Sequence, residues 1–246
     1  LREAGLPDGV CNVLTGTGAA VGAPLVGHEK VRHVTFTGSV NTGRTVMQAA
    51  ARHVASVTLE LGGKSPMVML ADCDMDAALE DVLWAIYSNS GQICSAGSRL
   101  VIERSIHAQF IERLAPLAAK LSHGHGLRNP QIGAITSVEQ LGKIAGYVDD
   151  ARARGVRVAA GGASAVDPVS GAGWFFQPTI LDGVGPKDRV VQEEIFGPVL
   201  AVIAFDTEEE AIAIANDTCY GLAASLWTAN INTAHRLSAA IRAGTV

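Results

Sequence analysis

The first 60 residues alternate short β-branched runs with helical patterns rich in small residues. The β-branched and aromatic residues predict strands at "CNVLTG", "RHVTFTG" and "SVTLELGG". The segments between them, "AAVGAPLVGH" and "VNTGRTVMQAAARHV", have the composition of helices. This β-α-β-α-β order is typical of a parallel sheet covered by helices.

The same alternation starts again after Pro66. It predicts strands at "MVMLAD" and "RLVIE", each followed by a helix, "MDAALEDVLWAIYSNS" and "SIHAQFIERLAPLAAKL". A polar loop, a helix near "VEQLGKIAGYVDDARARG" and the glycine-rich turn "AAGGAS" follow. The last part predicts strands at "FFQPTILDG", "GPVLAVIAF" and "AASLWT", with helices at "TEEEAIAIAND" and "NTAHRLSAAIRAG". The predicted fold class is α/β throughout.

Composition and charge narrow the functional classes. With 246 residues, 48% of them hydrophobic, the chain can build one large or two smaller cores. Its net charge of −5 comes from scattered acids and bases, so it lacks the basic surface that nucleic acid or anionic lipid attracts. The sequence contains neither a long apolar run nor a signal-peptide pattern. We therefore expect a cytoplasmic protein without nucleic-acid or membrane partners.

Cysteine and histidine spacing gives no metal signature. The four cysteines are far apart and form no C-x-x-C pair, which predicts reduced thiols: Cys11, Cys73, Cys94 and Cys219. His123 and His125 have no acidic or thiol ligand beside them, so we interpret "SHGHG" as a solvated loop and expect no metal.

The turn "VTFTGSVNTGRT" places Gly38 and Gly43 between a strand and the start of a helix, where backbone N–H groups can hold a phosphate. The spacing matches G-x-x-x-x-G, but Arg44 stands where a P-loop requires lysine, which disfavours a nucleotide triphosphatase. The upstream "GTGAAVG" misses the dinucleotide fingerprint by one position. Taken alone, the turn is equally consistent with a ligand-free connection.

Glu60 and Cys94 are chemically complementary. Glu60 ends an apolar strand in "VTLELGGKSP", where open α/β sheets place functional groups, and Cys94 lies among small residues in "SNSGQICSAGSRL". Taken separately, each favours a structural interpretation: a solvated strand-end charge and a buried thiol. Together, a thiolate can add to a carbonyl carbon and a carboxylate can activate the water that cleaves the resulting thioester.

Four motifs, "FTGSVNTG", "LELGGKSP", "NSGQICSAGSR" and "EEIFGPVL", occur in an order that resembles the NAD(P)-dependent aldehyde dehydrogenase superfamily. The resemblance covers essentially the whole chain. It implies a partial Rossmann-type cofactor domain over residues 1–62 and an α/β catalytic domain, truncated at its C-terminus, over residues 63–246. It also implies oxidation of a small-molecule aldehyde to a carboxylic acid with NAD or NADP.

The resemblance assigns roles to individual residues. Cys94 corresponds to the nucleophile, whose backbone N–H would also bind the oxyanion, and Glu60 to the base that activates water for deacylation. The positions expected to bind the cofactor lie at the glycine turn, after the base, in "EEIFGP" and, by a weaker match, in "SVEQLGKI": Gly38, Ser39, Gly43, Leu61, Glu194, Phe196, Gln140 and Lys143.

The resemblance further implies that the chain is a central fragment. It would lack the N-terminal part of the family fold, with its asparagine oxyanion donor, and the C-terminal oligomerisation strand. We expect the full-length protein to be a homo-oligomer, a dimer or tetramer, and the fragment alone to be poorly active or aggregated.

Two alternatives remain. In the acylating branch of the family, coenzyme A takes the acyl group in place of water, and those members lack the base that Glu60 provides. A catalytically silent binding or structural homologue is the other, disfavoured by the intact pair of Cys94 and Glu60.

Overall fold

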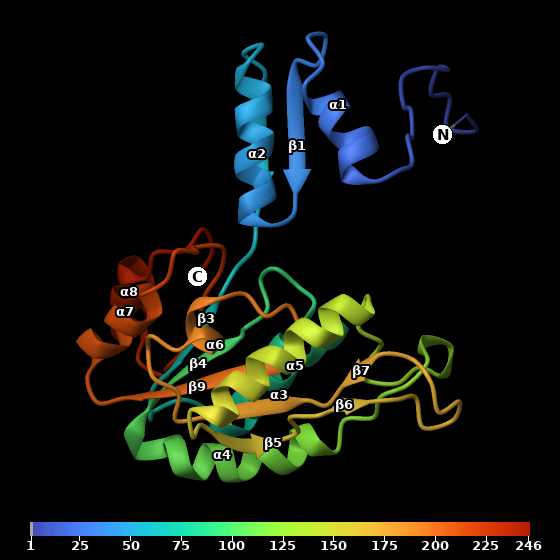
Figure 1. Ribbon diagram of the computed structural model, residues 1–246. Coiled ribbons are helices and arrows are strands. Elements are labelled where there is room, and N and C mark those ends of the chain that lie inside the picture. Colours follow the sequence, from blue (N-terminus) through green and yellow to red (C-terminus); the bar gives the residue numbers. More distant parts are fainter. Residues whose placement is uncertain (1) are drawn as a thin grey trace. The chain divides into compact units, whose positions relative to one another are not determined.

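The chain folds into two compact units, which the computed structural model describes over residues 2–246 (Figure 1). The division falls between Leu61 and Gly62, one residue before the expected domain boundary. None of the helices in residues 2–246 has the length and apolar character needed to cross a membrane.

The first unit is a small two-stranded α/β arrangement. Its elements in chain order are η1 (Gly18–Gly22), α1 (Ala23–Val26), β1 (His33–Thr37), α2 (Val40–Ala51) and β2 (Ser56–Glu60). Strands β1 and β2 are parallel and in register, with Thr37 opposite Glu60, so their C-terminal ends lie side by side. The helix α2 connects these strands as a crossover helix does in a βαβ unit.

The strand expected at "CNVLTG" was wrong. These residues form an irregular and exposed segment, in which 83% of the Val13 surface is accessible. A strand needs a neighbour that pairs with its N–H and C=O groups, and within residues 2–246 β1 pairs only with β2. The β-branched composition of the segment is therefore not enough to make it a strand.

The second unit contains a six-stranded sheet in the order β10-β3-β4-β9-β8-β5. All neighbouring pairs are parallel except β5 with β8. Its elements are β3 (Pro66–Met69), α3 (Met75–Tyr87), η2 (Ser88–Gly91), β4 (Arg99–Glu103), α4 (Arg104–Ala119), η3 (Gly126–Arg128), α5 (Val138–Ala153), β5 (Arg157–Ala160), β6 (Ser164–Ala165), β7 (Phe175–Phe176), β8 (Thr179–Asp182), α6 (Arg189–Gln192), β9 (Val199–Phe205), α7 (Glu208–Asn216), β10 (Ser225–Trp227) and α8 (Ile231–Ala240).

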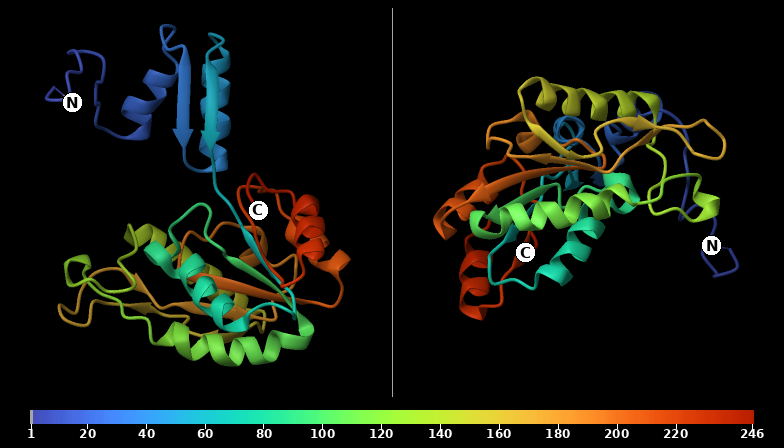
Figure 2. Two further views of the ribbon diagram at one scale, coloured as in Figure 1. Left: turned by 180° about the vertical axis from the view of Figure 1, so that it is seen from behind. Right: turned by 90° about the horizontal axis from the view of Figure 1, so that it is seen from below.

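Helices cover both faces of this sheet, as the further views show (Figure 2). One face packs against α5, α7 and α8 through buried residues such as Ile144 and Leu237. The other packs against α3 and α4 through residues such as Ile86 and Phe110. Because both faces are buried, β3 and β9 are apolar along their whole length and β4 is apolar between Arg99 and Glu103, as expected for parallel sheets. The predicted α/β class is confirmed.

The structure adds elements that the pattern did not predict. β5, β6 and α6 are two to four residues long, and the single strand expected at "FFQPTILDG" is divided into β7 and β8. Pro178 lies at the division and has no N–H to donate. The two pieces therefore pair with different partners: β7 with β6, and β8 with β5 and β9.

Candidate active site

Cys94 lies in the loop that joins α3 to β4. After α3 ends at Tyr87, Asn89, Ser90 and Gly91 adopt φ values of 49°, 59° and 69°, so the backbone turns through three consecutive left-handed residues. Such conformations are sterically costly for Asn and Ser, and side-chain anchors must therefore hold them. The Cys94 thiol that follows is free and partly buried.

Two side chains anchor this loop to residues 133–136. The Ser90 hydroxyl donates to the Gly133 carbonyl at 2.8 Å. The Gln92 amide donates to the Ala134 carbonyl at 3.1 Å and accepts from the Thr136 N–H at 2.8 Å. The position of the cysteine is thus fixed by contacts made by its neighbours in sequence.

Glycines allow three of the motifs to meet in the second unit. A Cβ on Gly63 would overlap the Cys94 carbonyl oxygen, and one on Gly91 would overlap the Gly197 carbonyl. A Cβ on Gly62 would overlap the carboxylate of Glu194. Segments of "LELGGKSP", "NSGQICSAGSR" and "EEIFGPVL" therefore meet at these glycines, and they line one cavity.

Glu194 faces this meeting point. Its Oε1 accepts a hydrogen bond from the Gly63 N–H at 3.2 Å. Burial raises the pKa of the Glu194 carboxyl, against the opposing effects of that N–H and of the Lys143 and Lys64 ammonium groups. Phe196, two residues later, has a φ of 56° and lines the same cavity.

The other two predicted cofactor residues of this unit lie on α5. The Gln140 side chain donates to the carbonyls of Ile195 and Phe196, at 2.8 and 3.0 Å. Lys143 is exposed and contributes positive charge near Glu194. Gln140 thus contacts the "EEIFGP" segment directly.

The remaining predicted residues come together at the ends of β1 and β2 in the first unit. The Gly38 N–H donates to the Glu60 carbonyl at 3.0 Å. Ser39 caps α2, since its hydroxyl accepts from the Thr42 N–H at 3.3 Å. The helix begins with N–H groups that lack partners within it, so this end can bind an anion.

Gly43 and Leu61 pack against each other here. A Cβ on Gly43 would lie 2.7 Å from the end of the Leu61 side chain, so the first turn of α2 packs closely against the residue that follows Glu60. The Glu60 side chain itself is exposed. Glu60 therefore belongs to the first unit, and Cys94 to the second.

Comparison with known proteins decides the family. The model of the aldehyde dehydrogenase family matches residues 1–246. The chain belongs to this family. The resemblance of the four motifs is thereby confirmed.

Relatives within the aldehyde dehydrogenase family agree in sequence and structure. Betaine aldehyde dehydrogenase of Bacillus subtilis (strain 168) is 41% identical over 247 residues, covering 100% of this chain and 50% of the relative. A crystal structure of betaine aldehyde dehydrogenase from Staphylococcus aureus in complex with NAD+ has a TM-score of 0.96 at 39% identity, covering 100% of this chain and 49% of that one. A crystal structure of indole-3-acetaldehyde dehydrogenase complexed with NAD+ has a TM-score of 0.96 at 44% identity, covering 100% and 50%. The chain spans about half the length of the relatives it matches.

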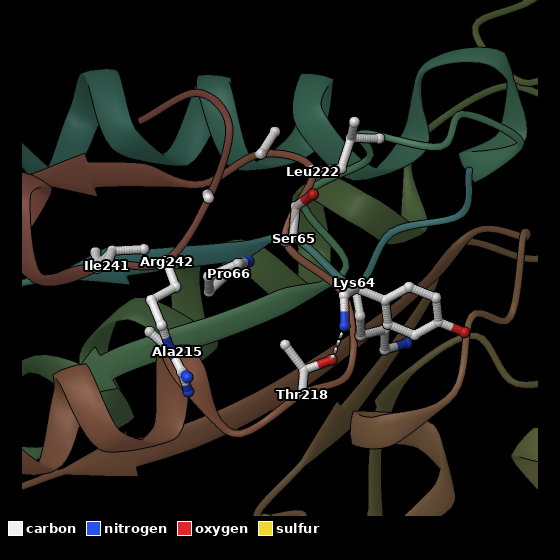
Figure 3. A pocket seen from close by; sticks show the side chains of 12 residues that line it. Lys64, Ser65, Pro66, Ala215, Thr218, Leu222, Ile241 and Arg242 are labelled. Atoms are coloured by element: carbon white, nitrogen blue, oxygen red, sulfur yellow. Dashed lines mark hydrogen bonds between the residues drawn. The ribbon is translucent and has the colours of Figure 1, made fainter. Parts of the chain in front are cut away.

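Sequence reasoning missed a buried lysine in this aldehyde dehydrogenase family chain. The side chain of Lys64 is 1% exposed, and its ammonium has no hydrogen-bond partner within residues 2–246. Burial, assisted by the nearby Arg99, lowers its pKa to about 7, while Glu194 and Glu193 act in the opposite direction. Lys64 lines a small cavity together with Thr218 (Figure 3). The signal was its place in "GGKSPMVM", directly before a fully buried strand.

Arg99 is a second buried cation. Its guanidinium donates to the carbonyls of Lys64, Ile214 and Ala215, at 2.7, 2.9 and 2.8 Å. It therefore ties the start of β4 to the segment before β3 and to the end of α7.

Proposed function

We propose that the whole protein carrying this chain oxidises an aldehyde to a carboxylic acid with NAD or NADP. The observation that carries the proposal is the meeting of the Cys94 loop with the Gly62–Gly63 and Glu194–Gly197 segments around one cavity. Membership of the aldehyde dehydrogenase family supports it.

In the proposed reaction the Cys94 thiolate adds to the aldehyde carbon and forms a thiohemiacetal. The backbone N–H of Cys94 stabilises its oxyanion without protonating it. A bound nicotinamide cofactor would supply the acceptor for the hydride that this carbon loses, which leaves a thioester on Cys94. Glu60 then removes a proton from water, the water oxygen attacks the thioester carbon, and the C–S bond breaks to give the acid and the free thiolate.

The residues present fit a nicotinamide cofactor. The capped N-terminus of α2, with Gly38, Ser39 and Gly43, offers backbone donors that suit a pyrophosphate. Glu194 carries a partly buried carboxylate, which suits a ribose hydroxyl pair. We assign Leu61 and Phe196 to the nicotinamide side, and Gln140 and Lys143 to the neighbourhood of the ribose. The two solved relatives named above contain NAD+, which supports NAD over NADP.

The test is formation of reduced nicotinamide by the whole protein with a panel of aldehydes. The panel includes betaine aldehyde and indole-3-acetaldehyde, since relatives are named for these substrates. We expect Cys94→Ala to abolish the increase in absorbance at the nicotinamide band. Cys73→Ala, which removes another partly buried free thiol, serves as the matched control and should retain activity.

Turnover by the Cys94→Ala variant would refute the proposal. Formation of acyl-CoA in place of acid when coenzyme A is added would assign the protein to the acylating branch. A wild-type protein that neither binds NAD nor oxidises any aldehyde would favour the silent homologue.

We propose further that the whole protein is a cytoplasmic homo-oligomer, a dimer or tetramer. All four cysteines are free thiols, in keeping with a reducing compartment. Trp84 on α3 is 72% exposed and lines an apolar hollow with Leu83 and Leu121, a surface that an interface could cover. Light scattering on the whole protein measures the oligomeric state.

A further inference from the structure

One face of α5 contacts the "EEIFG" segment at three points. Gln140, Ile144 and Tyr147 are spaced i, i+4 and i+7 along the helix, which places them on the same side. Their partners all lie within one short segment of the chain: Glu193, Ile195, Phe196 and Gly197. A rigid helix therefore runs against an irregular loop segment and makes contact at each turn.

The outer two contacts hold the ends of the segment. The Tyr147 hydroxyl donates to the Glu193 carboxylate at 2.6 Å. At the other end, a Cβ on Gly197 would overlap the Ile144 side chain, so the backbone there lies directly against the helix. These contacts limit where the three residues between them can lie.

The Gln140 side chain contacts the middle of the segment, although Gln140 is the first of the three residues along α5. Its single amide nitrogen donates to the carbonyl oxygens of Ile195 and Phe196, at 2.8 and 3.0 Å. These two carbonyls flank Phe196, whose φ of 56° is unfavourable for a residue with a side chain. Both amide hydrogens of Gln140 thus bind the backbone on either side of Phe196 and stabilise its unfavourable conformation.

The conformation of Phe196 determines where Glu194 points. The Glu194 carboxylate lies against Gly62 and accepts the Gly63 N–H at 3.2 Å. If Phe196 relaxed to an ordinary φ, the chain on its N-terminal side would change direction and this bond would be lost. We infer that Gln140 is a positioning residue, which holds the Glu194–Phe196 backbone in the shape that receives the cofactor. This inference rests on the proposed function, because it takes Glu194 and Phe196 to be cofactor-binding residues.

The first test uses Gln140→Met in the whole protein, a variant of similar length that cannot donate. Hydrogen exchange followed by mass spectrometry should show the backbone amides of residues 193–199 exchanging roughly tenfold faster, because two hydrogen bonds are removed. Gln109→Met is the matched control, since Gln109 is exposed in the middle of α4. It should leave exchange in residues 193–199 unchanged. Unchanged exchange in Gln140→Met would overturn the inference, whether or not the protein uses NAD.

The second test separates positioning from general damage. In Gln140→Met the KM for NAD should rise about tenfold and kcat should fall less than threefold, which corresponds to lost cofactor binding. Hydrolysis of an activated ester by Cys94 needs no hydride acceptor and should stay within twofold of wild type. In a Glu194→Gln background the additional effect of Gln140→Met on this KM should disappear, because both changes affect the same contact. Equal loss of ester hydrolysis, or additive effects in the double variant, would contradict the inference.

Different measurements would refute the proposed function and the positioning role of Gln140. A wild-type protein without NAD binding or turnover would refute the proposed function, and the exchange measurement would still decide whether Gln140 holds the segment.

Discussion

At the scale of single residues, the site depends on glycines, which have no side chain to keep neighbouring backbones apart. Gly91 has a φ of 69° and touches the Gly197 backbone, so it meets two requirements that only glycine satisfies together. Gly63 meets the second requirement alone, because its backbone lies against the Cys94 carbonyl. Backbone-to-backbone contact brings the motifs closer than any pair of side chains could.

Lys64 makes the stability of the chain depend on pH. Burial lowers its pKa from 10.5 to about 7 in the folded state, and unfolding returns it to water. Between these two values the unfolded chain binds more protons, so stability rises with pH by up to about 1.4 kcal/mol per pH unit. Below about pH 7 both states are protonated and the cost of the buried charge is present in full.

We therefore expect Lys64→Met to raise stability relative to wild type most at and below about pH 7, and progressively less toward pH 10. Urea unfolding at intervals of one pH unit measures this difference. Lys187→Met, which removes an exposed lysine paired with Asp217, is the control and should show no such trend. Parallel pH profiles for wild type and Lys64→Met would show that folding does not lower the pKa of this lysine.

At the scale of elements, a substitution at the N-terminus of α2 can test ligand binding without changing the stability of the helix. Ser39 caps this helix, and aspartate caps helices as well as serine does. We expect Ser39→Asp to keep the stability of α2 but to weaken NAD binding by roughly tenfold, because its charge repels a pyrophosphate.

Calorimetric titration with NAD measures this effect. Asn230→Asp adds the same charge at the N-cap of α8, which carries none of the predicted cofactor residues, and should leave affinity unchanged. Unaltered NAD binding by Ser39→Asp would mean that the phosphate site lies elsewhere.

The sequence predicted elements well where the pattern was long and local. The apolar run of β4 and the periodic face of α5 were both readable, since each reflects burial along its own element. "CNVLTG" failed because a strand also needs a partner, which its own residues do not specify.

Some residues of the candidate site could be predicted from the sequence for a different reason. The motifs and their order led to the prediction of Cys94 and Glu194 as site residues, and their roles stay predictions; the structure places both in segments that meet around one cavity. The hydrogen bond from Gln140 to the Ile195 carbonyl could not be predicted from the sequence, because it joins residues 55 positions apart through a backbone carbonyl. Lys64 was missed because lysine is ordinarily exposed, and only the packed structure shows its burial.

At the scale of the whole molecule, the two units differ in how much core they possess. In the described part of the first unit, the buried apolar side chains are Val46 and Ala50, at 8% and 0% exposure. The second unit contains both large apolar clusters. A unit with so little buried surface has little free energy to oppose its conformational entropy.

We expect backbone amides in β1, α2 and β2 of this 246-residue chain to exchange at least about a hundredfold faster than those in β3, β4 and β9. Hydrogen exchange followed by mass spectrometry measures both units in one sample. Equal protection of the two units would show that the first unit gains stability from contacts outside its own core.

Arg99 has a consequence for how the protein is made. Two of its three acceptors, the carbonyls of Ile214 and Ala215, lie 115 and 116 positions further along the chain. At translation rates of about 5 to 20 residues per second, they are synthesised roughly 6 to 23 s after it. Throughout that interval the cysteine motif is complete, but of the three carbonyls that accept from Arg99 in the folded protein only that of Lys64 has been synthesised. The native bonds of Arg99 to α7 can therefore form only late in synthesis, after most of the second unit has been made.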